Sequence, residues 1–164
     1  MMNTTQDRGP ARAGLGAAAA ALGLTLSLAG APLSAQDSAV ISANLFGDQV
    51  VADSGAEGES PDAEGNPDGN GDFNALVDRK KGQICYYLEA DGVGEVTAAH
   101  IHSGAVGKTG EAVVTLEMAE MDERCVTADP ALVGRMARSA GDYYVDIHTA
   151  ERPAGALRGQ MTGK

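Results

Sequence analysis

The chain has few aromatic and few basic residues. It contains no Trp and only two Phe among its 164 residues, so a binding surface built from large aromatic side chains is not expected. Lys and Arg number 12 against 23 Asp and Glu, which gives a formal net charge of -11 at pH 7. Nucleic acids and anionic membrane surfaces attract clusters of positive charge. The charge balance therefore argues against both as partners.

No apolar run in the chain reaches the ~20 residues that a transmembrane helix requires. The most apolar stretch, residues 13–28, follows Arg8 and Arg12 and precedes a segment of small residues that ends at Ala35. A short basic region, an apolar segment and a small residue at the break are typical of a secretory signal peptide. We therefore predict a signal peptide over residues 1–35. The mature protein is expected to be exported, periplasmic or extracellular, and not an integral membrane protein.

Residues 36–164 are sufficient for one domain with a hydrophobic core and too few for two. Within them, residues 53–72 are mostly Gly, Asp, Glu, Pro, Asn and Ser, with almost nothing to bury. This composition predicts a long acidic loop. Residues 66–77 have part of the ligand pattern of a calcium-binding loop, but Val77 stands where a ligating Glu is needed. A hydrated acidic turn is therefore favoured over a calcium site.

Cysteine is scarce, since Cys85 and Cys125 are the only two in the chain. In an oxidising compartment an isolated pair usually forms a disulfide, and two free thiols or two metal ligands are the alternatives. Neither cysteine lies near a histidine in the sequence. We therefore predict a disulfide between Cys85 and Cys125.

Short stretches rich in β-branched and apolar residues alternate with Gly-containing turns along the domain. They predict strands over residues 39–45, 73–78, 83–90, 96–102, 112–118, 142–148 and 156–161. One short helix is predicted over residues 129–138, because Asp129 is a suitable N-cap and Pro130 is favoured at the first helical position. Short strands at regular spacing indicate an all-β antiparallel sandwich or small barrel.

The three histidines of the chain lie in two of these predicted strands. Strand side chains alternate between faces, so His100 and His102 project from one face of their strand. His148 shares a face with Asp146, opposite the apolar face of its strand. A His-x-His pair with a third histidine from another strand can supply three nitrogen ligands, and imidazole suits copper, zinc and nickel. Histidines that make only ordinary hydrogen bonds are the alternative.

Little else in the sequence indicates a catalytic site. The serines lack the context of a nucleophile elbow. Gly104, Gly107 and Gly110 follow a predicted strand but lead into another strand, so no helix N-terminus is available to bind a phosphate. We expect these glycines to serve a tight turn, and we assign no catalytic residue.

Three segments of the domain resemble the CHRD domain, which was named from chordin and also occurs in exported microbial proteins. They are Ala99-His100-Ile101-His102-Ser103-Gly104 with Gly107 and Gly110, Tyr144-Val145-Asp146-Ile147-His148-Thr149, and Pro153-Ala154-Gly155-Ala156-Leu157-Arg158-Gly159-Gln160-Met161. The resemblance extends over residues 41–161, and the two cysteines stand where bacterial members commonly carry a pair. The acidic segment 53–72 departs from the family pattern.

A more distant resemblance is to Cu/Zn superoxide dismutase. The shared order is a His-x-His strand, a Gly-rich loop, a late strand with a histidine and a final Gly-x-x-Arg segment. This resemblance implies a Greek-key antiparallel β-sandwich. It also implies that His100, His102 and His148 match copper ligands and that Arg158 matches an arginine that guides anions to the metal. A structural salt bridge is the alternative role for Arg158.

The chain departs from the dismutase pattern in its metal ligands. It has no bridging histidine, no zinc-ligand set and no fourth copper histidine, so a site with two metal ions is excluded. One copper ion is the most that the resemblance implies. In that arrangement Asp146 would support the ligands from outside the ligand set.

The sequence leaves three functions open. The favoured one is a non-enzymatic binding or envelope-associated module with an unknown protein or envelope partner. The second is a copper-binding protein for storage, sequestration or delivery, which would use the three histidines. The third and least favoured is a redox enzyme that acts on superoxide or a similar small oxidant.

Overall fold

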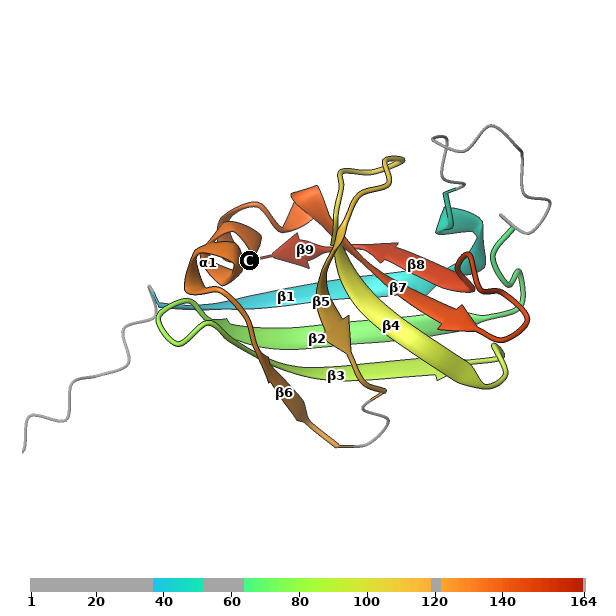
Figure 1. The fold of residues 1–164 in the computed structure, drawn as a ribbon, viewed down its shortest axis with the longest axis horizontal. Coiled ribbons are helices and arrows are strands. Elements are labelled where there is room, and N and C mark those ends of the chain that lie inside the picture. Colours follow the sequence, from blue (N-terminus) through green and yellow to red (C-terminus); the bar gives the residue numbers. More distant parts are fainter. Residues whose placement is uncertain (1–36, 52–63, 119–121, 164) are drawn as a thin grey trace, which may run out of the picture. The chain divides into compact units, whose positions relative to one another are not determined.

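The computed structural model describes residues 37–51, 64–118 and 122–163 (Figure 1). The predicted signal peptide and residues 53–63 of the predicted acidic loop lie outside the described residues. The strands of the described part are β1 (Ser38–Phe46), β2 (Asn70–Asp78), β3 (Gln83–Asp91), β4 (Val96–Ser103), β5 (Ala112–Leu116), β6 (Arg124–Thr127), β7 (Tyr143–Thr149), β8 (Leu157–Gln160) and β9 (Thr162–Gly163). Its helices are α1 (Pro130–Arg138) and two 3-10 turns, η1 (Gly47–Gln49) and η2 (Ala140–Asp142). Within these ranges no helix has the length and apolar character needed to span a bilayer.

The strands form one antiparallel sheet that curls into a nearly closed barrel-like sandwich. Their order is β5-β4-β7-β8-β1-β2-β3-β6, with β9 also paired to β1. Residues from strands throughout this sheet, together with residues of α1, form one buried hydrophobic core. Strands β3 and β6 are neighbours although they are not consecutive in sequence, and so are β4 and β7, which is typical of Greek-key connections (Figure 1). The prediction of an all-β Greek-key domain with one short helix is confirmed.

Alternate residues of each strand fill the interior of the sheet. In β2, Phe73 and Val77 are buried, whereas Leu76 points outward with 53% of its surface exposed. In β4, Ala99 and Ile101 are buried. Burial of a large apolar side chain stabilises the fold by about 1.5–3 kcal/mol. A shift of one residue in strand pairing would expose these side chains, so their burial fixes the register of the strands. This register turns the His-x-His pair of β4 away from the core.

Helix α1 forms where the sequence predicted it. The Asp129 side chain accepts a hydrogen bond from the Ala131 backbone N–H at 2.6 Å, and Pro130 occupies the first turn. Val133 and Met136 are buried on the helix face that meets β1, β2 and β3. The opposite face remains at the surface.

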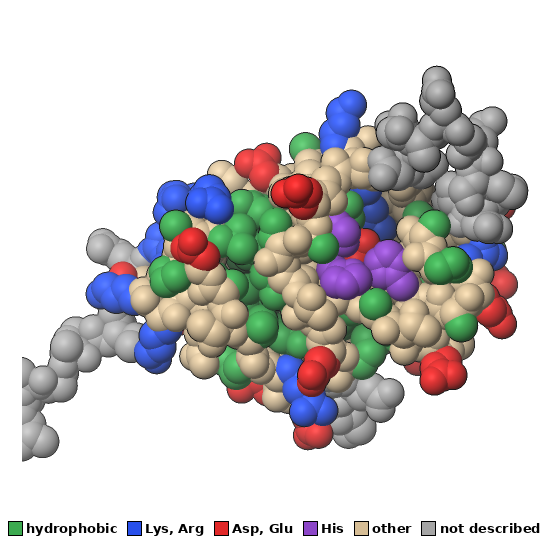
Figure 2. All heavy atoms as spheres, viewed as in Figure 1, with side chains coloured by type: hydrophobic (Ala, Val, Ile, Leu, Met, Phe, Trp, Pro, Cys, Tyr) green, Lys and Arg blue, Asp and Glu red, His purple; other side chains and the backbone are tan. Residues whose placement is uncertain are grey.

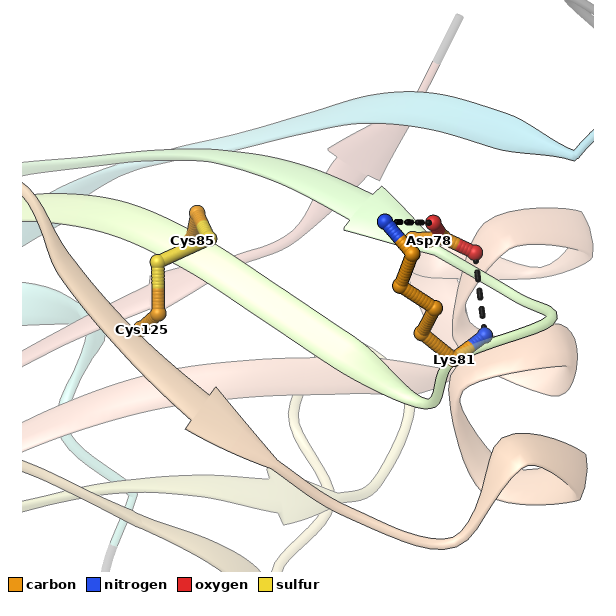
Figure 3. Close-up of a disulfide and its surroundings, with 4 residues drawn as sticks. All are labelled: Asp78, Lys81, Cys85 and Cys125. Atoms are coloured by element: carbon orange, nitrogen blue, oxygen red, sulfur yellow. Dashed lines mark hydrogen bonds and ion pairs between the residues drawn. A yellow bond between two sulfur atoms is a disulfide. The ribbon is translucent and has the colours of Figure 1, made fainter. Parts of the chain in front are cut away.

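A disulfide joins Cys85 of β3 to Cys125 of β6, as predicted (Figure 3). The two cysteines lie directly opposite each other in the β3–β6 register. Glu123 lies close to both sulfurs. Because the sulfurs are bonded to each other, they are not available as metal ligands, which removes that alternative.

The structure departs from the predicted strands in three places. Strand β6 was not predicted, and its four residues are held by pairing with β3 and by the disulfide. Strand β2 begins at Asn70, so residues 70–72 of the predicted acidic loop are in a strand, paired with β1 on one side and β3 on the other. The short β9 was also missed, and within the described part of the chain it pairs only with β1. In each case pairing with a neighbouring strand, rather than local composition, determines the conformation.

Candidate metal centre

The three histidines and Asp146 come from two neighbouring strands. In the antiparallel register of β4 and β7, His100 lies opposite Asp146 and Ala98 lies opposite His148. Directly opposed residues project from the same face of a sheet, and residues two apart in a strand share that face. The histidines therefore gather on the outer side of β4 and β7, where Figure 2 shows them together at the surface.

The four side chains turn their polar atoms toward one another. The Asp146 carboxylate lies 3.4 Å from His100 Nδ1, 3.0 Å from His102 Nε2 and 3.2 Å from His148 Nε2. One ligand atom from each residue lies within 4.8 Å of the other three. Nevertheless, these three nitrogens and Asp146 Oδ1 are buried without a hydrogen bond of acceptable geometry to any described residue. Three imidazole nitrogens and a carboxylate oxygen that converge in this way can act together as ligands of a metal ion.

Backbone carbonyl groups fix the orientation of two of the rings. His102 Nδ1 lies 2.8 Å from the Gly110 carbonyl oxygen, and His148 Nδ1 lies 3.0 Å from the Pro153 carbonyl oxygen. A carbonyl oxygen only accepts hydrogen bonds, so both Nδ1 atoms carry a proton and donate it. In the neutral rings the Nε2 lone pair then points at Asp146. This is the arrangement that metal-ligating histidines commonly have, with the second nitrogen held by an outer partner.

The Asp146 carboxylate and the rings of His102 and His148 shift one another's pKa values. Burial alone would raise the pKa of Asp146, but the His102 and His148 rings outweigh it and hold that pKa far below its usual value. Burial alone would lower the pKa of His102, yet the Asp146 carboxylate and the Gly110 carbonyl together raise it. The pKa of His148 is raised chiefly by the Asp146 carboxylate, against the opposing effect of burial. The cluster therefore attracts positive charge, either as protons on the rings or as a bound cation.

Tyr144 and Arg158 lie beside the cluster. The Tyr144 ring stacks on the His102 ring, with 4.9 Å between centroids and an interplanar angle of 11°. The guanidinium carbon of Arg158 lies 3.5 Å from the centroid of the Tyr144 ring, and its Nη2 donates a hydrogen bond to the Lys108 carbonyl at 2.6 Å. Arg158 forms no ion pair with a described residue. It holds the Gly-rich loop instead of forming the salt bridge that the sequence left open.

The loop between β4 and β5 requires Gly110. A Cβ atom at this position would stand 1.8 Å from the Ser103 carbonyl oxygen, and the Gly110 carbonyl is the group that orients His102. We expect Gly110→Ala to lower the free energy of unfolding by about 1–3 kcal/mol, the usual cost of overpacking. Urea denaturation measures this loss. Gly141→Ala is the matched control, because a Cβ there meets nothing within 4 Å; equal stability of the two variants would contradict the expectation.

The structure brings together His100, His102, Asp146 and His148, with Arg158 beside them, and it adds Tyr144 to the residues that the sequence singled out. Asp146 was expected to support the ligands from outside the ligand set, and its carboxylate lies within 3.4 Å of one nitrogen of each ring, close enough to act as a ligand itself. Tyr144 was not considered as a site residue. Strand alternation alone could have found it, because it stands two residues before Asp146 and opposite His102 in the β4–β7 register.

Fold and site together define an antiparallel barrel-like domain that presents a cluster of three histidines and one carboxylate on its outer surface. The model of the CHRD domain family matches residues 41–161. The match covers well over half of the chain, and the protein belongs to this family. Searches of curated proteins and of solved structures found no match to the chain.

Proposed function

We propose that this CHRD domain is a non-enzymatic binding module whose ligand is one divalent transition-metal ion. The ligands are His100 Nδ1, His102 Nε2 and His148 Nε2, with the Asp146 carboxylate as the fourth donor. The observation that carries the proposal is the convergence of three ring nitrogens and a carboxylate whose ligand atoms lie within 4.8 Å of one another. These nitrogens contact only the Asp146 carboxylate among the described residues, without good hydrogen-bond geometry, and an ion between them would satisfy all four groups.

The distances in the cluster fit a small ion. Metal–ligand bonds of about 2.0–2.1 Å place neighbouring donors of a tetrahedron about 3.3–3.4 Å apart. Asp146 Oδ1 lies 3.4 Å from His100 Nδ1, and its Oδ2 lies 3.0 Å and 3.2 Å from the Nε2 atoms of His102 and His148. All the ligand atoms lie within 4.8 Å of one another, so an ion can be accommodated when the side chains draw together around it. Two of the rings are already oriented by backbone carbonyls, which lowers the entropic cost of binding.

Copper is the preferred ion. Imidazole is a good ligand for copper, zinc and nickel, and among divalent first-row metals the affinity of a given site is highest for Cu²⁺. The disulfide and the family membership are consistent with an exported protein, and export places the domain in the periplasm or outside the cell. There it would store, sequester or deliver copper.

Binding is favoured over redox catalysis by two features. Three histidines and one carboxylate supply four protein ligands, whereas catalytic zinc sites have three and keep a position open for water or substrate. Arg158, the residue that would guide a small anion, is only 5% exposed and donates instead to the Lys108 carbonyl. Neither feature supports turnover of superoxide.

The test is a metal titration of the purified protein. After incubation with excess Cu²⁺ or Zn²⁺ and removal of unbound metal, we expect one equivalent of copper per chain, and copper should displace zinc in competition. Elemental analysis measures the retained metal. Retention of no metal, or of several equivalents without a plateau, would overturn the proposal.

The stability of the fold is expected to depend on pH differently in the metal-free and the metal-bound protein. The lowered pKa of Asp146 stabilises the fold above its usual value of 3.8, and this contribution is lost only as pH falls through the lowered pKa. The raised pKa values of His102 and His148 stabilise the metal-free fold fully below 6.5, and this contribution is lost as pH rises through the raised values. The metal-free cluster is therefore most stabilising between about pH 4 and 6.5.

Copper requires neutral rings, so its affinity should change in the opposite direction. We expect the rise in Tm on adding copper to be larger at about pH 8 than at about pH 5.5, because protons compete for the rings at the lower pH. Thermal denaturation with and without copper at each pH measures the rise. Because the comparison is made within each pH, other titrating groups cancel. An equal or smaller rise at the higher pH would argue against binding through the histidines.

A further inference from the structure

A second polar site lies where helix α1 meets the turn between β2 and β3. An open hollow of about 810 Å³ is lined there by Arg79 and Lys80 from the turn and by Arg135 and Arg138 from the helix. Asp37 is the acidic residue among its lining groups. Figure 2 shows Lys and Arg side chains gathered at the end of the molecule where Figure 1 places α1.

The turn that supplies Arg79 and Lys80 is fixed by its own hydrogen bonds. Asp78 Oδ1 accepts from the backbone N–H groups of Lys80 and Lys81, both at 3.0 Å, and the Lys81 ammonium pairs with the same carboxylate at 3.3 Å (Figure 3). The Asp78 carboxylate is thus bound by Lys80 and Lys81 of its own turn. Lys80 Nζ also pairs with Asp37 at 2.6 Å. The conformation of the turn is thus fixed, with Arg79 and Lys80 facing the same hollow as the helix residues.

The helix contributes its outer face to the hollow. The residues of α1 that line the hollow are Pro130, Ala131, Gly134, Arg135 and Arg138. Gly134 has no side chain to fill the space, and a Cβ there would stand 3.2 Å from the nearer guanidinium nitrogen of Arg138. The Arg138 guanidinium thus lies over Gly134. Neither Arg135 nor Arg138 forms an ion pair with a described residue.

The charge of this hollow is opposite to that of the chain as a whole. Four cationic side chains line it together with one carboxylate, in a protein of formal net charge -11. The Asp37 carboxylate pairs with Lys80, which leaves an excess of positive charge from Arg79, Arg135 and Arg138. A concave surface with such an excess attracts anions. The overall acidity, which argued against anionic partners, conceals this local reversal.

We propose that the hollow between α1 and the β2–β3 turn binds a phosphate-class oxyanion. Guanidinium groups recognise the oxygens of phosphate through paired hydrogen bonds. Arg135 and Arg138, which form no ion pair with a described residue, can do so alongside Arg79. The same chemistry is offered by free inorganic phosphate and by the headgroup of an anionic phospholipid. The site is independent of the histidine cluster, and its loss leaves metal binding unchanged.

The experiment compares three forms of the protein against both sources of phosphate. The forms are the unaltered chain, the double variant Arg135→Gln/Arg138→Gln, and the control Arg124→Gln, an exposed arginine of β6 that does not line the hollow. One arm titrates sodium phosphate and follows backbone amide NMR shifts. The other arm measures co-sedimentation with vesicles of phosphatidylglycerol mixed with phosphatidylcholine, against vesicles of phosphatidylcholine alone.

We expect saturable binding in at least one arm, weakened about tenfold or more in the double variant and unchanged in Arg124→Gln. Shifts of Gly134 and Arg79 on adding phosphate identify free phosphate as the ligand. Binding only to the charged vesicles identifies the headgroup. No binding in either arm, or equal weakening in the double variant and the control, would overturn the proposal.

Discussion

His148→Ala is expected to abolish retention of copper by the domain. The substitution removes one of three nitrogen ligands and the only one whose ring is held by the Pro153 carbonyl. Loss of an outer partner of a metal-ligating histidine typically costs about 10–100-fold in affinity, so loss of the ligand itself should cost more than about 100-fold. The affinity follows from competition with a chelator of known strength.

The same experiment distinguishes the ligands from their surroundings. His100→Ala and His102→Ala should match His148→Ala, since each removes one nitrogen from the cluster. Asn74→Ala, an exposed polar residue of β2 far from the cluster in the sheet order, is the control and should retain one equivalent. Copper retention by His148→Ala equal to that of the control would show that the metal is bound elsewhere.

Removal of the disulfide is expected to destabilise the fold without affecting the metal centre. The bridge closes a loop with a sequence separation of 40 residues. In the chain-entropy model a loop of this length contributes roughly 3–4 kcal/mol. Cys125 is exposed and Cys85 is only half-buried, so little packing is lost with the sulfurs. The expected cost of Cys85→Ala/Cys125→Ala is therefore nearly that of the cross-link alone.

Urea denaturation of the double cysteine variant measures this cost. Among the described strands, β6 pairs only with β3, and the cross-link holds that edge of the sheet. The histidines lie on β4 and β7. Copper stoichiometry of the folded variant should therefore stay at one equivalent. A change in unfolding free energy below about 1 kcal/mol would contradict the assigned role, since it would fall outside the usual range for a loop of this size.

The outline of the fold could be predicted from local patterns. Alternation of apolar residues placed most strands, and Asp129 followed by Pro130 placed helix α1. The face shared by His100 and His102 followed from the same alternation. These features depend on residues close in sequence, where composition and geometry are directly linked.

Other features depend on contacts between distant segments. Strand β6 has no strong pattern of its own and forms because β3 and Cys85 hold it. The central position of Asp146 follows from the β4–β7 register, which no local pattern specifies. The basic hollow likewise joins Arg79 of a turn to residues of α1 more than 50 positions later. The net charge of the chain does not predict the basic hollow, because the fold determines which charged side chains become neighbours.

The most direct test of the metal centre is a crystal structure of the copper-loaded protein, with anomalous scattering recorded at the copper absorption edge. The proposal predicts one copper peak within about 2.0–2.1 Å of each of His100 Nδ1, His102 Nε2 and His148 Nε2, the length of metal–imidazole bonds. The Asp146 carboxylate should complete the coordination. A copper peak at any other place in the molecule, or a histidine cluster without copper in crystals that contain the metal, would contradict the account.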